Sequence, residues 1–173
     1  MYCLQRGWPY NARSDAESGD VQAQLYLATQ YFNSSQPAKT LRWYKKAAAQ
    51  GNPEAMANLA ELYLSGKGGA KLKLVKSCEW MEKYLTSDSI EKETDTIKKI
   101  LHEYGVFLLG ARTSVTIQPQ QQLPIEMRDA KKACQLLERA GNEFNCMDSI
   151  KMLGSGLHMT GQHPQVPRDF DKT

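Results

Sequence analysis

The side chains that most often bind metals or act as nucleophiles are scattered in this sequence and form no familiar chemical pattern. The chain has three histidines and four cysteines, with no His-Glu-x-x-His and no Cys-x-x-Cys among them. Zinc sites and redox-active thiol pairs need ligands at such short spacings, so we expect no metal and no cofactor. The residues concerned are His102, His158, His163, Cys3, Cys78, Cys134 and Cys146.

Cys134 and Cys146 flank Gly141, where a turn could place two helices side by side. A disulfide between these cysteines would indicate an exported protein. Packed thiols at small helical positions are the simpler interpretation, and the sequence leaves the choice open.

Two glycine-rich segments have only a superficial likeness to catalytic or phosphate-binding loops. Residues 66–69 (Gly-Lys-Gly-Gly) lack the Gly-Lys-Ser/Thr ending of a phosphate loop and follow a helical pattern rather than a strand. Residues 154–156 (Gly-Ser-Gly) lack the Gly-x-Ser-x-Gly spacing of a hydrolase elbow. We therefore expect turns at these places and a protein that is not an enzyme.

Composition and charge are those of an ordinary globular protein of 173 residues. A formal net charge of +3 is too mild to indicate nucleic-acid binding. No apolar run approaches the roughly 20 residues that a membrane helix requires. Residues 1–8 lack the basic and then apolar pattern of a signal peptide, so we expect a cytoplasmic protein. A periplasmic or secreted location stays open if the chain is a fragment or has lost an export signal.

An internal repeat is the strongest pattern in the sequence. Residues 19–31 resemble residues 51–63 at a constant offset of 32. The matching pairs are Gly19/Gly51, Asp20/Asn52, Ala23/Ala55, Leu27/Leu59, Ala28/Ala60 and Tyr31/Tyr63. Repeats of this period are typical of solenoids, whose units stack on one another.

Each unit has the pattern of two helices joined by a turn. Apolar residues recur at helical spacing after Asp20 and Asn52, which are suitable N-caps. Ala28 and Ala60 are small, which allows neighbouring helices to approach closely. Second helices are expected over about 38–50 and 72–85, and further helices over 90–109 and 130–140, the last ended by Gly141-Asn142.

We expect a single α-solenoid domain over residues 1–161, with about three and a half units. The units lie at about 16–50, 51–85, 90–140 and 141–161. Residues 111–127 are polar and contain a glutamine-rich run, which predicts a long loop. Residues 162–173 are expected to form a flexible tail.

The repeat resembles the Sel-one-like repeat, a relative of the tetratricopeptide repeat. The resemblance is carried by residues 16–83, above all by Ala-x-x-Gly-Asp/Asn-x-x-Ala-x-x-x-Leu-Ala-x-x-Tyr followed by Trp43-Tyr44-Lys45-Lys46-Ala47-Ala48. It implies an all-α solenoid of helix-turn-helix repeats that acts as a protein–protein adaptor, often in bacteria. Relatives serve as signalling scaffolds, secreted virulence factors or antagonists of secreted toxins.

By resemblance to tetratricopeptide geometry, the first helix of each unit lines a concave groove that binds a helix or peptide of another protein. The residues that this geometry selects for partner binding are Leu25, Thr29, Phe32, Glu61, Leu64, His102, Val106, Leu109 and Lys151. The alternative is that Phe32, Leu64 and Leu109 pack between units.

A general adaptor or scaffold is the function we expect, with no nucleic acid and no membrane span. The alternative is an immunity or inhibitor protein that neutralises a secreted bacterial effector or toxin, because the chain is small and its polar loop could reach into a partner. A hydrolase is disfavoured, since no nucleophile lies beside a base in the sequence.

Overall fold

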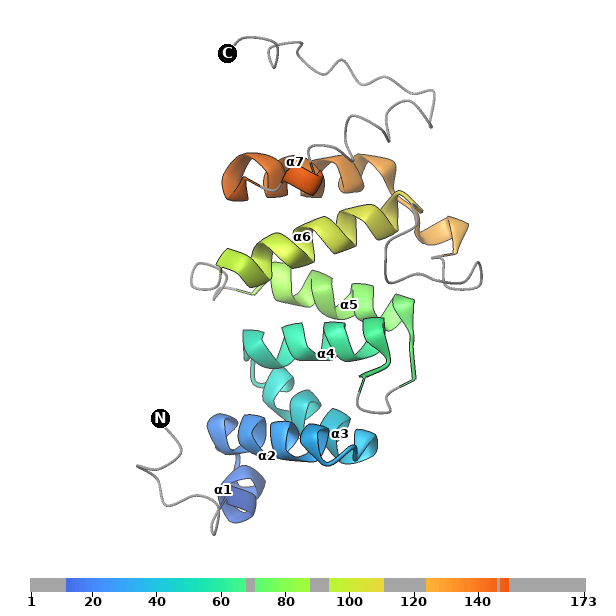
Figure 1. Cartoon of the computed structure of the whole chain (residues 1–173). Helices are drawn as coiled ribbons and strands as arrows, with labels where there is room; N and C mark the ends of the chain where they lie inside the picture. Colours follow the sequence, from blue (N-terminus) through green and yellow to red (C-terminus); the bar gives the residue numbers. More distant parts are fainter. Residues whose placement is uncertain (1–11, 68–70, 88–93, 111–123, 146, 150–173) are drawn as a thin grey trace.

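The chain folds into a stack of helices, without strands in the part that the structure describes (Figure 1). The computed structural model describes residues 12–67, 71–87, 94–110 and 124–149, except 146. The α-helices are α1 (Ala12–Ser18), α2 (Val21–Asn33), α3 (Pro37–Ala49), α4 (Pro53–Ser65), α5 (Leu74–Leu85), α6 (Thr94–Leu108) and α7 (Ala130–Phe144), and a short 3-10 helix, η5 (Ile125–Met127), precedes α7.

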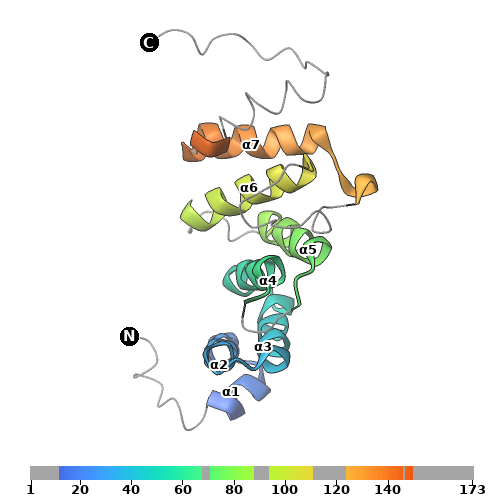
Figure 2. The same ribbon diagram turned by 45° about the vertical axis from the view of Figure 1, so that its right-hand side comes forward.

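Successive helices pack in pairs, and the pairs stack into a solenoid. Helix α2 packs on α3, α4 on α5, and α6 on α7. The pairs are joined by contacts of α3 with α4 and of α5 with α6, while α1 packs on α2 in the position of a preceding second helix. Figure 2 shows α2 and α4 on one side of the stack and α3 and α5 on the other. The predicted all-α solenoid is confirmed.

The turns between units are built by the cap residues that the sequence predicts. The Asp20 carboxylate accepts a hydrogen bond from the Ala23 N–H at 2.8 Å, and the Asn52 side chain accepts one from the Ala55 N–H at 2.8 Å. Each cap pairs a backbone donor that the first turn of a helix leaves unsatisfied. The glycine before the second cap, Gly51, has a φ of +82°, which favours glycine there.

Small residues allow the two helices of a pair to approach closely. Ala28 and Ala60 are 0% and 2% exposed. At Ala60 the carbonyl oxygen of α4 accepts a hydrogen bond of 2.7 Å from the buried Ser77 hydroxyl of α5. A side chain of α5 can reach the backbone of α4 in this way only where the residue of α4 that faces α5 is small.

Gly105 occupies the corresponding position of α6. A Cβ atom added there would lie 2.7 Å from Cγ of Leu137 and 3.2 Å from the carbonyl oxygen of Ala133, both on α7. The sequence predicts this position, because Tyr104-Gly105 aligns with Leu59-Ala60 as a large residue followed by a small one.

Polar side chains tie the third helix pair to the second. The Glu82 carboxylate of α5 accepts a hydrogen bond of 3.4 Å from the Tyr104 hydroxyl of α6 and forms an ion pair with Lys132 of α7. The Lys132 ammonium also lies over the Tyr104 ring. One carboxylate therefore connects three helices.

The structure corrects one helix end. Helix α7 continues through Gly141 and Asn142 to Phe144 and ends at Asn145, whose φ of +49° is left-handed. Gly141 is buried within the helix and does not end it. Of the predicted loop 111–127, residues 111–123 lie outside the described residues, and the remainder includes η5. The predicted tail 162–173 and Cys146 also lie outside them.

The close contact at Gly105 generates a prediction about stability. Gly105→Ala should lower the free energy of unfolding by about 1–3 kcal/mol, because the added methyl group overlaps Leu137. In an uncrowded helix the same change raises stability by up to about 1 kcal/mol, so the sign of the effect is diagnostic.

Urea unfolding followed by circular dichroism would measure this change. Gln135→Ala, on the exposed surface of α7, is the control and should leave stability nearly unchanged. A Gly105→Ala variant as stable as the wild type would contradict the close approach of α6 and α7.

Candidate functional site

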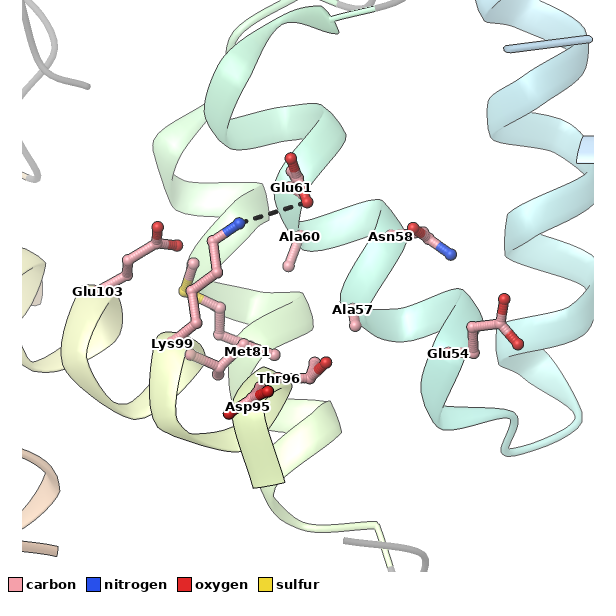
Figure 3. Close-up of a pocket in the computed structure, with 11 residues that line it drawn as sticks. Glu54, Ala57, Asn58, Ala60, Glu61, Met81, Asp95, Thr96, Lys99 and Glu103 are labelled. Atoms are coloured by element: carbon pink, nitrogen blue, oxygen red, sulfur yellow. Dashed lines mark hydrogen bonds and ion pairs between the residues drawn. The ribbon is translucent and has the colours of Figure 1, made fainter. Parts of the chain in front are cut away.

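Two adjoining hollows lie along the face formed by the first helices of the three pairs. The α2–α4 hollow has a volume of about 400 Å³ and is lined by Thr29, Phe32, Asn33, Tyr44, Glu54, Asn58, Glu61, Leu62, Ser65 and Lys67. The α4–α6 hollow has a volume of about 330 Å³ and is lined by Glu54, Ala57, Asn58, Ala60, Glu61, Met81, Asp95, Thr96, Lys99, Ile100 and Glu103 (Figure 3). Together they form what we call the first-helix groove.

Residues of α4 belong to both hollows and join them. Glu54, Asn58 and Glu61 line the groove on either side of this helix. They lie three to four residues apart in sequence, the spacing that places side chains along one face of a helix. Helix α4 therefore lies in the middle of the groove and contributes lining residues to both hollows.

Glu61 is the best-connected charged residue of the groove. Its carboxylate oxygens lie 3.3 Å from Nζ of Lys67 and 3.4 Å from Nζ of Lys99, which reaches across from α6 (Figure 3). Partial burial raises the pKa of Glu61, but the ammonium groups of Lys99 and Lys67 outweigh it and lower the pKa below its usual value. Glu61 is consequently ionised at neutral pH.

Glu103 has the opposite electrostatic environment. Burial raises the pKa of Glu103, Lys99 opposes the shift, and the carboxylate of Glu61 adds to it. Among the described residues, no lysine or arginine forms an ion pair with Glu103 within 4.0 Å. Figure 3 shows Lys99 between the Glu103 and Glu61 side chains, with its ammonium group directed to Glu61.

Three residues predicted for partner binding line the groove. Thr29 and Phe32 line the groove from α2, and Glu61 lines it from α4. The Thr29 hydroxyl donates to the Leu25 carbonyl oxygen at 3.0 Å and shares a hydrogen bond of 3.2 Å with the Tyr44 hydroxyl of α3. These contacts fix the orientation of Thr29.

Three other predicted groove residues belong to the core instead. Leu25, Leu64 and Val106 are 5%, 3% and 3% exposed and line neither hollow, so the groove does not present their side chains to a partner. The helices rotate these positions inward, as the alternative interpretation anticipated for Leu64. Burial of large aliphatic side chains stabilises the stack and explains their apolar character.

The remaining predicted residues lie away from both hollows or outside the described residues. Nδ1 of His102 is hydrogen-bonded to the buried Ser149 hydroxyl at 2.8 Å, and burial lowers the His102 pKa although Asp148 opposes the shift. Leu109 is half-buried against the core. Lys151 lies outside the described residues.

Sequence reasoning missed Asn58, Lys99 and Glu103. A signal for two of them was present, because Asn58 and Glu103 each directly precede a large–small pair, Leu59-Ala60 and Tyr104-Gly105. Lys99 matched ordinary surface charge on a helix, and nothing in its spacing indicates that it crosses to α4.

Metal ligands and reactive thiols are the chemical groups of interest among the described residues. Among them, no group of three or more His, Cys, Asp or Glu could hold a metal ion. Burial raises the pKa of the Cys78 thiol to about 12, so this sulfur is protonated and unreactive at neutral pH. No described helix combines the length and the apolar character needed to cross a membrane.

Because Glu61 and Glu103 have different environments, neutralising them should change the free energy of unfolding in opposite directions. At neutral pH, Glu61→Gln should lower the free energy of unfolding, by at most about 1 kcal/mol because its ion pairs are exposed and screened. Glu103→Gln should raise it, because it removes an ionised carboxylate whose pKa is higher in the folded chain than in the unfolded one.

Both effects should fade in acid. The contribution of Glu61 is present above its unfolded pKa and is lost as the pH falls through its folded pKa. The advantage of Glu103→Gln disappears once the pH falls below the unfolded pKa, where the wild-type group is protonated in both states. Urea unfolding at neutral and acidic pH would measure this, with Glu79→Gln on α5 as the control. A loss of stability in Glu103→Gln at neutral pH would contradict the assignment.

Comparisons with known proteins agree with the repeated helix pairs of the structure. The family model described as Sel1 repeat matches residues 21–52, 53–83, 126–143 and 148–173, which together are more than half of the chain. No curated protein matched the chain.

A solved structure supplies the second comparison. The chain is similar to a Sel1 repeat protein from Oxalobacter formigenes, with a TM-score of 0.54 and 30% sequence identity over 76% of this chain. The match covers 33% of that protein, so this chain spans about a third of its length. Sel1 repeats are generally protein–protein interaction modules. The chain belongs to the Sel1 repeat family.

Proposed function

We propose that this chain is an adaptor that binds a segment of another protein in the first-helix groove. The single observation that carries the proposal is that two hollows, between α2 and α4 and between α4 and α6, adjoin and share the lining residues Glu54, Asn58 and Glu61. Helices α2, α4 and α6 follow one another along the stack (Figure 2), so a groove that crosses all three is elongated. An elongated groove suits an extended or helical segment of a partner.

The lining of the groove also suits a protein partner. Its lining includes apolar side chains such as Ala57 and Phe32 together with amides, hydroxyls and charged groups. Apolar contact surrounded by polar groups is the common composition of protein interfaces. Solenoids expose such elongated surfaces because each unit contacts only its neighbours.

The identity of the partner distinguishes the adaptor from the alternative, an immunity or inhibitor protein. A secreted effector or toxin seated in the groove would make this chain its inhibitor. A component of a signalling or assembly complex would make it a scaffold. The predicted polar loop, on which the inhibitor interpretation depends, lies mainly outside the described residues.

The test is capture of partners from native extract with wild-type chain and with Asn58→Trp. Asn58 is half-buried and lies in both hollows, so an indole there fills the groove without replacing a core residue or changing the charge. A stoichiometric partner should be retained by the wild type and reduced at least about tenfold by the variant, the effect of losing about 1.4 kcal/mol of binding energy.

Gln135→Trp, on the exposed surface of α7, is the matched control and should retain the partner. Circular dichroism would confirm that both variants fold. If folded Asn58→Trp binds the partner as well as the wild type does, the binding site lies elsewhere on the chain.

A further inference from the structure

The charge of the groove differs in sign from that of the whole chain. The chain has a formal net charge of +3. The α4–α6 hollow is nevertheless lined by four carboxylates, from Glu54, Glu61, Asp95 and Glu103, and by a single ammonium group, that of Lys99. Fields focused within a hollow attract ligands of the opposite charge.

Helix α3, on the other side of the stack, is basic (Figure 2). Helix α3 contains Lys39, Arg42, Lys45 and Lys46 and no acidic residue. Several of these cations are occupied by aromatic rings: Nζ of Lys46 lies 4.5 Å from the centre of the Trp43 ring and Nζ of Lys39 lies 5.0 Å from that of Tyr31. The net charge of the whole chain therefore does not indicate that the groove is acidic or that α3 is basic.

Within the hollow, Glu103 is the carboxylate best placed to gain from an incoming cation. It is partly buried, and no described lysine or arginine pairs with it. Lys99, which lies between Glu103 and Glu61, is 53% exposed, and its ion-pair partner among the described residues, Glu61, is 44% exposed. An exposed pair of this kind is weak, so the Lys99 side chain can move into solvent at little cost.

The lining of the hollow also suits the stem of a long side chain. Half-buried Ala57 supplies most of its apolar contact, because the other apolar lining residues, Ala60, Met81 and Ile100, are only 2%, 1% and 5% exposed. Lysine and arginine combine an aliphatic stem with a cationic end group, so they match a lining that holds both apolar atoms and carboxylates. Arginine can in addition bind a carboxylate through two parallel hydrogen bonds.

We propose that the α4–α6 hollow accepts a lysine or arginine side chain of the partner, so that the segment bound in the first-helix groove is basic. The inference rests on the proposed function and adds the chemical class of the partner segment. The cation lies between Glu61 and Glu103, and Lys99 moves aside.

Selection from a random peptide library displayed on phage tests this inference. The library, with peptides of about twelve residues, which span about 40 Å when extended, is selected on immobilised wild-type chain, on the double variant Glu61→Gln/Glu103→Gln and on the control Glu79→Gln/Glu138→Gln. The control removes two exposed carboxylates from α5 and α7, so its net charge equals that of the double variant. Peptides selected on the wild type should be enriched in lysine and arginine.

The affinity of a selected basic peptide, measured by fluorescence anisotropy, should fall at least about tenfold in the double variant and less than about twofold in the control. The net positive charge of the chain makes the test stringent, because non-specific attraction would enrich acidic peptides. Wild-type peptides without basic enrichment, no selected peptides at all, or equal losses in both variants would overturn the inference.

The same reagents separate this inference from the proposed function. If Asn58→Trp abolishes capture of a natural partner whose binding segment lacks lysine and arginine, the groove function stands and the basic specificity is wrong. If Asn58→Trp binds the selected basic peptides normally, the proposed groove itself is wrong.

Discussion

The close approach of the two helices in each pair is the constraint on which the rest of the structure depends. It is clearest at Gly105, where a single added carbon would lie 2.7 Å from Leu137. Ala60 occupies the same place in the preceding pair, and its carbonyl oxygen accepts the hydrogen bond of the buried Ser77 hydroxyl. A larger residue at either position would separate the helices and open the core. The stack therefore requires a small residue once in every pair.

This constraint also places the groove. Residues on either side of the small position cannot enter the contact between paired helices, so their side chains lie at its border. On α4, Asn58 and Glu61 flank the pair Leu59-Ala60 and line both hollows. Glu103 precedes Tyr104-Gly105 and lines the next one. Residues that pack between the paired helices are thus followed or preceded in the sequence by residues that line the groove.

Much of the fold could be predicted from the sequence because it depends on local rules. Asp20 and Asn52 cap their helices as their side chains and positions indicate, and the offset of 32 residues fixes the first two pairs. The prediction failed at Gly141, which continues a helix instead of ending it, because glycine can adopt helical backbone angles as well as the left-handed angles of a helix end. A glycine alone does not distinguish the two.

The sequence by itself determined the helix pairs, their caps and the small residues between them, since these follow from backbone geometry and from spacing along one helix. Only the tertiary structure decided which side chains face the groove. Leu64 and Val106 are rotated into the core, while Lys99 crosses from α6 to Glu61 on α4. The burial of a helical residue depends on the angle at which the next helix crosses it, and that angle is set by residues far away in the chain. For the same reason the acidic character of the groove is hidden in a chain whose total charge is positive.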